Sequence, residues 1–188
     1  MKATVLLIFI AALSLAGCGN SENQHIIPRR TAYPRPQLPD TVLADYKDAP
    51  LHFEVNTDAA TSSPKEGWLN IRYPMLGATV HVTFTPTTTS DIDEVRHNRM
   101  ERLMLNAGDK PSNHSEFTNY EGFDILLSET DGATTPVQFL ASDGERWVVS
   151  GAAYFDNPAA TSSTDSIRPM IKAIKRDLLE ALKNLSER

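Results

Sequence analysis

Hydrophobic and polar residues alternate along two neighbouring stretches of the chain, residues 68–73 and 79–85. A period of two is the spacing at which successive side chains of a strand point to opposite faces of a sheet. Pro74 and Gly77 lie between the two stretches and favour a tight turn. The pattern therefore predicts an antiparallel hairpin, with threonines and His81 on its outer face. The side chains expected to face the core are Leu69, Ile71, Tyr73, Val80, Val82 and Phe84.

Three further strands are predicted in the second half of the chain, at residues 123–128, 136–141 and 147–155. Asp131-Gly132 lies between the first and second, and Asp143-Gly144 between the second and third. Asp-Gly between two apolar runs is a strong hairpin signal, because both residues tolerate the backbone angles of a tight turn. The three strands are therefore expected to be antiparallel neighbours.

The run at residues 147–155 is apolar at most positions, which predicts a central strand covered on both faces. Its small residues at 151–153 leave room for a helix to pack closely. Residues 52–55 form a short strand candidate. The stretches 57–66 and 109–121 are polar and are predicted as loops.

Residues 90–108 carry the spacing of an amphipathic helix. Ser90 followed by Asp93 predicts a capping box at its start, and Gly108 fits just past its end. The apolar face of this helix is expected to consist of Ile92, Val95, Met100, Leu103 and Met104.

The last part of the chain contains the clearest helical pattern. Asp165 or Ser166 is expected to cap it, and Pro169 to lie in its first turn, where a proline is tolerated. Apolar residues recur at steps of three and four at Ile167, Met170, Ile171, Ile174, Leu178, Leu182 and Leu185.

The predicted element order is one strand, a two-stranded hairpin, a helix, three strands and a final helix. Strands joined by such short turns must be antiparallel. The sequence therefore predicts a single α+β domain at residues 51–188, a mostly antiparallel sheet of about five to six strands with two main helices packed on it. This order faintly resembles the Mog1/PsbP sandwich, which is an analogy of fold and carries no activity.

The first 17 residues have the layout of a secretory signal peptide. Lys2 supplies the positive charge, and Val5–Leu15 is an 11-residue, almost entirely apolar run that is too short to span a membrane. Leu15-Ala16-Gly17-Cys18 resembles the lipobox of bacterial lipoproteins. The resemblance implies cleavage before Cys18, diacylglycerol on its sulfur, and an acyl chain such as palmitate on its amino group. Several acyl chains hold a protein firmly on a membrane without a spanning helix.

Residues 18–50 are predicted to be the lipidated cysteine followed by a tether without regular structure. Five prolines between Pro28 and Pro50 interrupt it, and proline-rich chains are extended spacers. Arg29, Arg30 and Arg35 lie close to the anchor. The sequence is consistent with two roles for these arginines, contact with anionic lipid and docking on the domain, and does not choose between them.

Charge and cysteine content exclude several classes of protein. Without Lys2 the chain keeps 17 Lys and Arg against 24 Asp and Glu, a formal charge of −7, which argues against nucleic acid as a partner. Cys18 is the only cysteine, so intramolecular disulfides and cysteine-based zinc sites are excluded. Residues 109–165 are acidic and the last helix is basic, which we interpret as solvated patches that neutralise one another within the fold.

Catalytic motifs are absent from the sequence: it has no Gly-x-Ser-x-Gly, His-Glu-x-x-His, phosphate loop or Gly-x-Gly-x-x-Gly. We interpret His97 and Glu101 as a surface pair rather than half of a metal site. Residues 129–132 and 143–145 resemble pieces of calcium loops but lack the full ligand set, so we interpret them as turns. We predict no catalytic, cofactor-binding or metal-binding residue and no enzymatic activity. The histidines weighed for such roles are His25, His52, His81, His97 and His114.

Five segments of the sequence resemble the GldD family of gliding-motility lipoproteins. They are residues 68–74 (WLNIRYP), 136–140 (PVQFL), 149–155 (VSGAAYF), the terminal helix and the arginine-proline run 28–35. The resemblance implies a non-enzymatic accessory of the gliding-motility or type IX secretion machinery. It also implies an outer-membrane location, facing the periplasm, with acyl chains on Cys18 in the membrane and envelope proteins as partners.

Two other functions remain open from the sequence. One is a lipid-anchored module that binds a small ligand or a peptide in a groove beside the sheet. The other is an unrecognised hydrolase, which the missing motifs disfavour.

Overall fold

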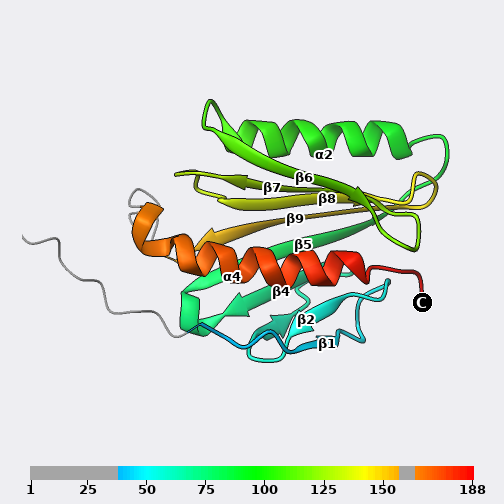
Figure 1. The fold of residues 1–188 in the computed structure, drawn as a ribbon. Helices are drawn as coiled ribbons and strands as arrows, with labels where there is room; N and C mark the ends of the chain where they lie inside the picture. Colours follow the sequence, from blue (N-terminus) through cyan, green and yellow to red (C-terminus); the bar gives the residue numbers. More distant parts are fainter. Residues whose placement is uncertain (1–37, 157–163) are drawn as a thin grey trace, which may run out of the picture. The chain divides into compact units, whose positions relative to one another are not determined.

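The structure, a computed structural model, describes residues 38–156 and 164–188. They form a seven-stranded antiparallel sheet of order β3-β4-β5-β9-β8-β7-β6 and a separate two-stranded sheet (Figure 1). The predicted α+β class is confirmed. The large sheet contains β3 (Ala60–Ser62), β4 (Trp68–Tyr73), β5 (Ala78–Pro86), β6 (Ser112–Thr118), β7 (Asp124–Thr130), β8 (Val137–Ser142) and β9 (Trp147–Phe155). The remaining elements are β1 (Leu43–Asp45), β2 (Glu54–Asn56), the 3-10 helix η1 (Pro74–Leu76), α2 (Ile92–Ala107) and α4 (Thr164–Lys183).

The predicted hairpin at β4 and β5 is confirmed, with Leu69 opposite Val82 and Ile71 opposite Val80. Gly77 closes the turn after η1 in the left-handed conformation, which a residue without a Cβ adopts at little cost. The three predicted strands of the second half also pair as antiparallel neighbours, and β9 is the central strand of seven. All six predicted core residues of the hairpin are buried.

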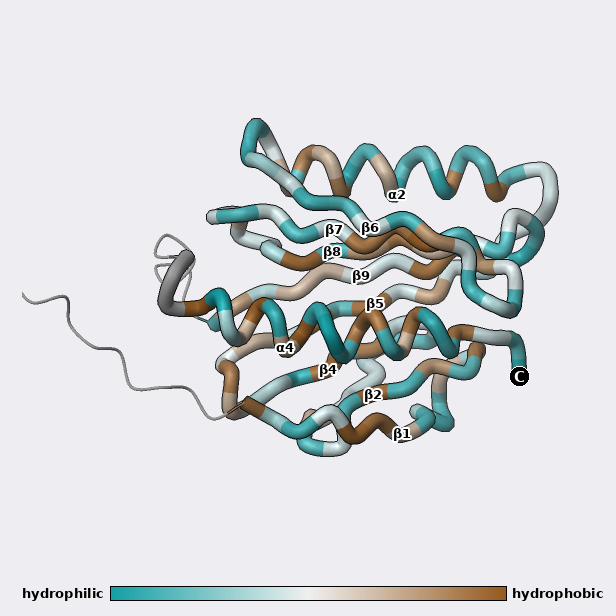
Figure 2. Tube along the Cα trace, in the orientation of Figure 1, coloured by the Kyte–Doolittle hydropathy of each residue, from teal (hydrophilic) through white to brown (hydrophobic). Residues whose placement is uncertain are grey.

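Helix α4 covers one face of the sheet and completes the main core. Its predicted apolar stripe is buried at Ile167, Ile171, Ile174, Leu178 and Leu182. Figure 2 shows hydrophobic residues at regular steps along this helix, above the strands that it covers. Pro169 lies in the second turn rather than the predicted first, because the helix begins at Thr164.

The end of α4 is held by a side chain that the sequence reasoning did not single out. Asn119, in the turn between β6 and β7, donates to the carbonyl oxygens of Leu182 and Leu185 at 3.0 and 2.8 Å. Its own side-chain oxygen accepts the backbone N–H groups of Glu121 and Phe123. The last carbonyl groups of a helix accept no hydrogen bond within the helix. The buried Asn119 amide donates the hydrogen bonds that these carbonyl groups would otherwise lack.

Helix α2 lies on the opposite face of the sheet, against β8 and β9 (Figure 1). The predicted residues Ile92 and Leu103 are buried there with Leu140 and Val148. The assignment of Met104 to this face is wrong, because its side chain is 62% exposed.

The predicted capping box at Ser90 is not formed, and Asp91 occupies the N-cap position of α2. Its carboxylate accepts the backbone N–H and the hydroxyl of Thr88 at 2.5 and 2.7 Å, which organises the turn that leads into the helix. Gly108 follows the helix with a positive φ, as expected.

The chain before residue 51 is more ordered than a tether. Residues 43–45 form β1, which pairs with β2, so the expectation of no regular structure there is wrong. Ala49 is buried in the main core, and Arg188 donates to the Asp45 carboxylate with both terminal nitrogens, at 3.1 and 3.0 Å. The proline content could not predict the contacts of Asp45, because Arg188 comes from the other end of the chain.

Two stretches predicted as loops contain edge strands. Residues 60–62 form β3, whose three residues are all exposed, and residues 112–118 form β6. Edge strands are half-solvated, so their polar sequences carry little hydrophobic signal. They bring the sheet to seven strands instead of five to six.

The space above Gly151 is filled by the ring of neighbouring Phe139 and not, as the sequence suggested, by a helix. A Cβ at residue 151 would lie 2.7 Å from Phe139 Cζ.

Candidate functional site

The residues considered for chemistry are scattered. Cys18 and His25 lie outside the described residues, so the lipidation of Cys18 stays a prediction. His97 Nε2 lies 3.3 Å from Glu101 on exposed helix surface, the interpreted surface pair. His52 lies 3.1 Å from Asp45 on the small sheet, and His114 is exposed on β6 rather than in a loop. Among the described residues, no group of three or more His, Cys, Asp or Glu side chains is arranged to hold a metal ion.

Of the two acidic segments interpreted as turns, residues 143–145 form the turn before β9, whereas Glu129 and Thr130 end strand β7 and the turn begins at Asp131. Asp143 Oδ1 accepts the backbone N–H groups of residues 145, 146 and 147 at 3.0, 2.8 and 2.9 Å. These bonds lower the pKa of Asp143 despite its burial, whose effect is the opposite. The carboxylate of Glu129 pairs with Lys175 of α4 at 2.8 Å, which joins the acidic part of the chain to the basic helix as interpreted from the sequence.

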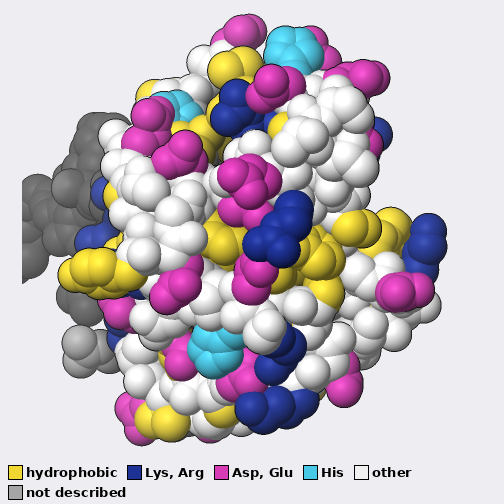
Figure 3. Space-filling model, turned by 90° about the vertical axis from the view of Figure 1, so that its right-hand side faces the viewer, with side chains coloured by type: hydrophobic (Ala, Val, Ile, Leu, Met, Phe, Trp, Pro, Cys, Tyr) yellow, Lys and Arg dark blue, Asp and Glu magenta, His cyan; other side chains and the backbone are white. Residues whose placement is uncertain are grey.

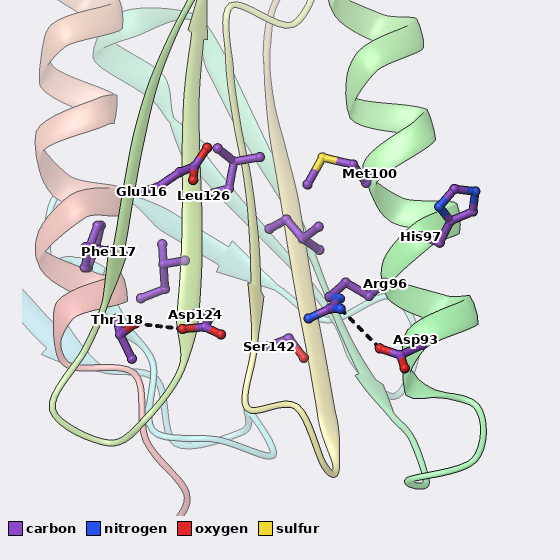
Figure 4. Close-up of a pocket in the computed structure, with 12 residues that line it drawn as sticks. Asp93, Arg96, His97, Met100, Glu116, Phe117, Thr118, Asp124, Leu126 and Ser142 are labelled. Atoms are coloured by element: carbon purple, nitrogen blue, oxygen red, sulfur yellow. Dashed lines mark hydrogen bonds and ion pairs between the residues drawn. The ribbon is translucent and has the colours of Figure 1, made fainter.

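Helix α2 covers the sheet incompletely and leaves a hollow on each of its sides. We call the first the α2–β6 groove, a hollow of about 830 Å³ between α2 and strands β6, β7 and β8. Figure 4 shows Met100 and Arg96 pointing from the helix toward the strands, with Leu126 and Ser142 opposite and His97 at the outer rim. Met100, Leu126 and Leu140 give the groove an apolar floor.

The rim of the α2–β6 groove carries uncompensated acids. Asp124 accepts a hydrogen bond from Thr118 at 2.7 Å, while Arg96 is paired with Asp93 at 3.1 Å. Within the described part of the chain, neither Glu116 nor Asp124 contacts a Lys or Arg side chain. The groove therefore combines an apolar floor with a locally negative rim.

The second hollow, about 400 Å³, lies on the other side of α2, above β5, β9 and β8. We call it the arginine niche, and we define it by Arg99, Arg102, Asn106, Gln138, His81 and Tyr154. Gln138 is buried beneath it, accepting from Asn106 at 2.9 Å and donating to the Leu103 carbonyl at 3.3 Å. These bonds hold the helix to β8 and set the depth of the hollow.

Aromatic and polar contacts position the strand side of the niche. His81 Nδ1 lies 2.7 Å from Asn70 Oδ1, and the His81 ring meets Tyr154 edge-on with centroids 5.4 Å apart. Tyr154 remains 39% exposed. His81 is therefore a surface residue of the outer face, as predicted, but one with a fixed orientation.

The positive charges of the two guanidinium groups in the niche are not balanced by neighbouring carboxylates of the described residues. Burial lowers the pKa of Arg99, and the nearby charge of Arg102 lowers it further. Arg99 donates to the Thr85 hydroxyl at 3.3 Å. Neither arginine contacts a carboxylate of residues 38–156 or 167–188. Sequence reasoning missed both, since two arginines on the polar side of an amphipathic helix are the usual solvated pattern.

The edge of the molecule at the strand ends and turns has a mixed surface. Figure 3 shows a strip of hydrophobic side chains across this face, flanked by interspersed acidic and basic side chains. Arg146 and Glu187 form an ion pair between the β8–β9 turn and the end of the chain. This face therefore carries no extended patch of one charge.

The comparison with known families agrees with the sequence resemblance. Among the described residues, no helix is long and apolar enough to cross a membrane. No curated protein matches the chain. A family model described as gliding motility lipoprotein GldD matches residues 23–186, nearly the whole sequence. The chain therefore belongs to the GldD family of gliding motility lipoproteins.

Proposed function

We propose that the protein is a lipid-anchored, non-enzymatic accessory of the gliding-motility and type IX secretion machinery. Acyl chains on Cys18 anchor it in the outer membrane, and its domain faces the periplasm. The family membership supports a membrane-attached envelope protein of gliding motility. The lipobox-like Leu15–Cys18 segment supports the position of the anchor.

The anchor has a direct test. Cys18→Ala removes the sulfur that carries diacylglycerol, so the variant should incorporate no fatty-acid label in growing cells and should leave the membrane fraction. Fatty-acid label retained on the variant, or an unchanged membrane fraction, would contradict the proposal.

The α2–β6 groove is the surface that we propose binds an envelope protein. The observation that carries this proposal is the apolar floor of Met100, Leu126 and Leu140 beside the uncompensated acids Glu116 and Asp124. Buried apolar side chains supply most binding energy at interfaces, and complementary charges at the rim set the choice of partner. The fitting partner is a protein segment with apolar side chains flanked by Lys or Arg.

Charge reversal tests this surface. The variant Glu116→Lys/Asp124→Lys should lose the crosslinked partner that the native protein captures in the envelope, and should not restore movement or secretion in cells lacking the native copy. The matched control is Glu121→Lys/Glu145→Lys, the same change of charge at exposed turn residues outside the groove. Melting temperatures verify folding. Full function of the groove variant, or an equal loss in the control, would refute the groove as the docking site.

Catalysis predicts a different pattern of losses. Removing one general base or nucleophile typically lowers a rate by orders of magnitude. Alanine at His81, His97 or His114, singly, should therefore leave movement and secretion intact under our proposal. A folded, correctly localised single variant with complete loss would favour the hydrolase.

A small-ligand module is the second candidate function. The arginine niche favours it, because a hollow lined by unpaired cations and polar side chains is suited to an anion.

A further inference from the structure

Arg99 and Arg102 face one hollow from successive turns of α2. Arginines near one another repel, so a fold normally places carboxylates between them. Here no carboxylate of the described residues lines the hollow, and Glu101, the acid next to Arg102 in the chain, lies 3.3 Å from His97. The niche therefore concentrates positive charge that the described residues do not neutralise.

The opposite wall of the hollow supplies neutral hydrogen-bonding groups and no carboxylate. Tyr154 brings a hydroxyl, and His81 brings the ring nitrogen that its contact with Asn70 leaves unused. Asn106 adds an amide from the helix side. The described lining thus contains no carboxylate, and its groups come from four separate elements, α2, β5, β8 and β9.

We propose that the arginine niche binds a phosphate group, carried by a small molecule or by a phospholipid headgroup. A phosphate monoester carries about 1.5 to 2 negative charges near pH 7 and three strong acceptor oxygens. Two guanidinium groups match that charge and donate in the fork geometry that oxyanions accept. The hollow of about 400 Å³ is large enough for the group together with part of the molecule that bears it.

This site is separate from the protein-docking groove, because the two lie on opposite sides of α2. The inference rests on the second candidate function, the small-ligand module, and it can fail without the failure of the docking groove. It also assigns a role to the part of the sheet face where Tyr154 stays exposed.

The test is calorimetric titration of the full-length protein, in a neutral detergent at fixed ionic strength, with inorganic phosphate and with glycerol 3-phosphate. We expect saturable binding at one site. Arg102→Gln, an exposed position, should weaken it by about tenfold, since a charge-assisted hydrogen bond contributes on that scale. Arg99→Gln should weaken it similarly, with melting temperatures measured because Arg99 is half-buried.

The matched control is Arg72→Gln. Arg72 is an exposed arginine on the same side of the sheet, already paired with Asp156 and outside the niche. Its replacement removes the same charge and should leave the affinity for phosphate unchanged. An equal loss in this control would show general attraction of anions to the surface, and would overturn the proposal.

The source of the phosphate group is distinguished by a third titrant, short-chain phosphatidic acid in neutral mixed micelles, with phosphatidylcholine as the comparison. Arg102-dependent binding that is at least tenfold tighter than that of glycerol 3-phosphate would identify a lipid headgroup. Equal affinities would identify a soluble molecule. Absence of saturable binding by all phosphate titrants, or tighter binding of succinate than of phosphate, would refute a phosphate site.

Discussion

The two faces of the central sheet are covered by helices of different character. On one face, α4 buries an apolar residue in every turn over the main core and contacts β7 and β8, and β2 of the small sheet packs beside it. On the other face, α2 buries Ile92 and Leu103, while Met104 and Leu105 are 62% and 79% exposed. The first face is closed over a core, and the second is open on both sides of its helix.

We infer from this difference that the α4 face mainly stabilises the fold, whereas the α2 face offers surfaces for binding. A continuous apolar stripe contributes burial energy at each turn, on the order of 2 kcal/mol for a fully buried Leu or Ile side chain. A helix with few buried positions can stand off the sheet and leave hollows that polar groups line. We therefore expect substitutions on the α4 face to change unfolding, and substitutions on the α2 face to change binding.

The largest effect is expected from Ile174→Ala. Ile174 is fully buried in the middle of α4, and its truncation leaves a cavity that the packed sheet cannot fill. The free energy of unfolding should fall by about 2–5 kcal/mol, measured by chemical denaturation. An unchanged unfolding midpoint would show that the helix face is wrongly assigned.

Gly151→Ala tests the closest packing within the same core. A Cβ at residue 151 would overlap the ring of buried Phe139, with Cζ at 2.7 Å. Such overpacking typically costs about 1–3 kcal/mol. Because the clash is with one ring, the double variant Gly151→Ala/Phe139→Leu should lose less stability than the two single losses added together. Strict additivity would contradict the contact.

Asp45 should make the closed face sensitive to acid. Hydrogen bonds from Lys47 and Arg188 lower the pKa of this carboxyl from 3.8 to about 2. A folded-state pKa below the unfolded value contributes stability above about pH 4, and that contribution disappears as the pH falls toward 2. Asp45→Asn should thus lose stability at pH 7 and show a shallower decline between pH 4 and pH 2. If the free energy of unfolding changed with pH in the same way for the native protein and Asp45→Asn, the proposed role of Asp45 would be wrong.

The smallest effect on stability is expected on the outer side of α2. Met104→Ala and Leu105→Ala remove side chains that are mostly in solvent, so unfolding should change by no more than about 0.5 kcal/mol. A loss as large as that of Ile174→Ala would mean that this side of α2 is covered in the native protein. The α2 face would then be closed like the α4 face, and the difference between the two faces would not hold.

Sequence patterns predicted the elements whose residues alternate between water and a core. The β4–β5 hairpin, the three strands β7, β8 and β9, and the stripe of α4 follow directly from this periodicity. The same reasoning failed for β6 and β3, because an edge strand with polar residues on both sides has no period to detect. It also misplaced Met104, since the spacing of α2 defines an apolar side but not how much of it meets the sheet.

The sequence by itself determined the class of protein: the lipobox-like segment before Cys18, the α+β order of elements and the family resemblance are all local or linear features. The tertiary structure alone decided where recognition is possible. Arg99 and Arg102 are neighbours along one helix, but Tyr154 joins them only because β9 lies beside β5 under α2. Glu116 and Leu126 likewise form a groove only because β6 pairs with β7 below that helix. The physical reason is that a hollow arises from incomplete packing between distant segments, and the pattern along a single segment carries no information about the distance between them.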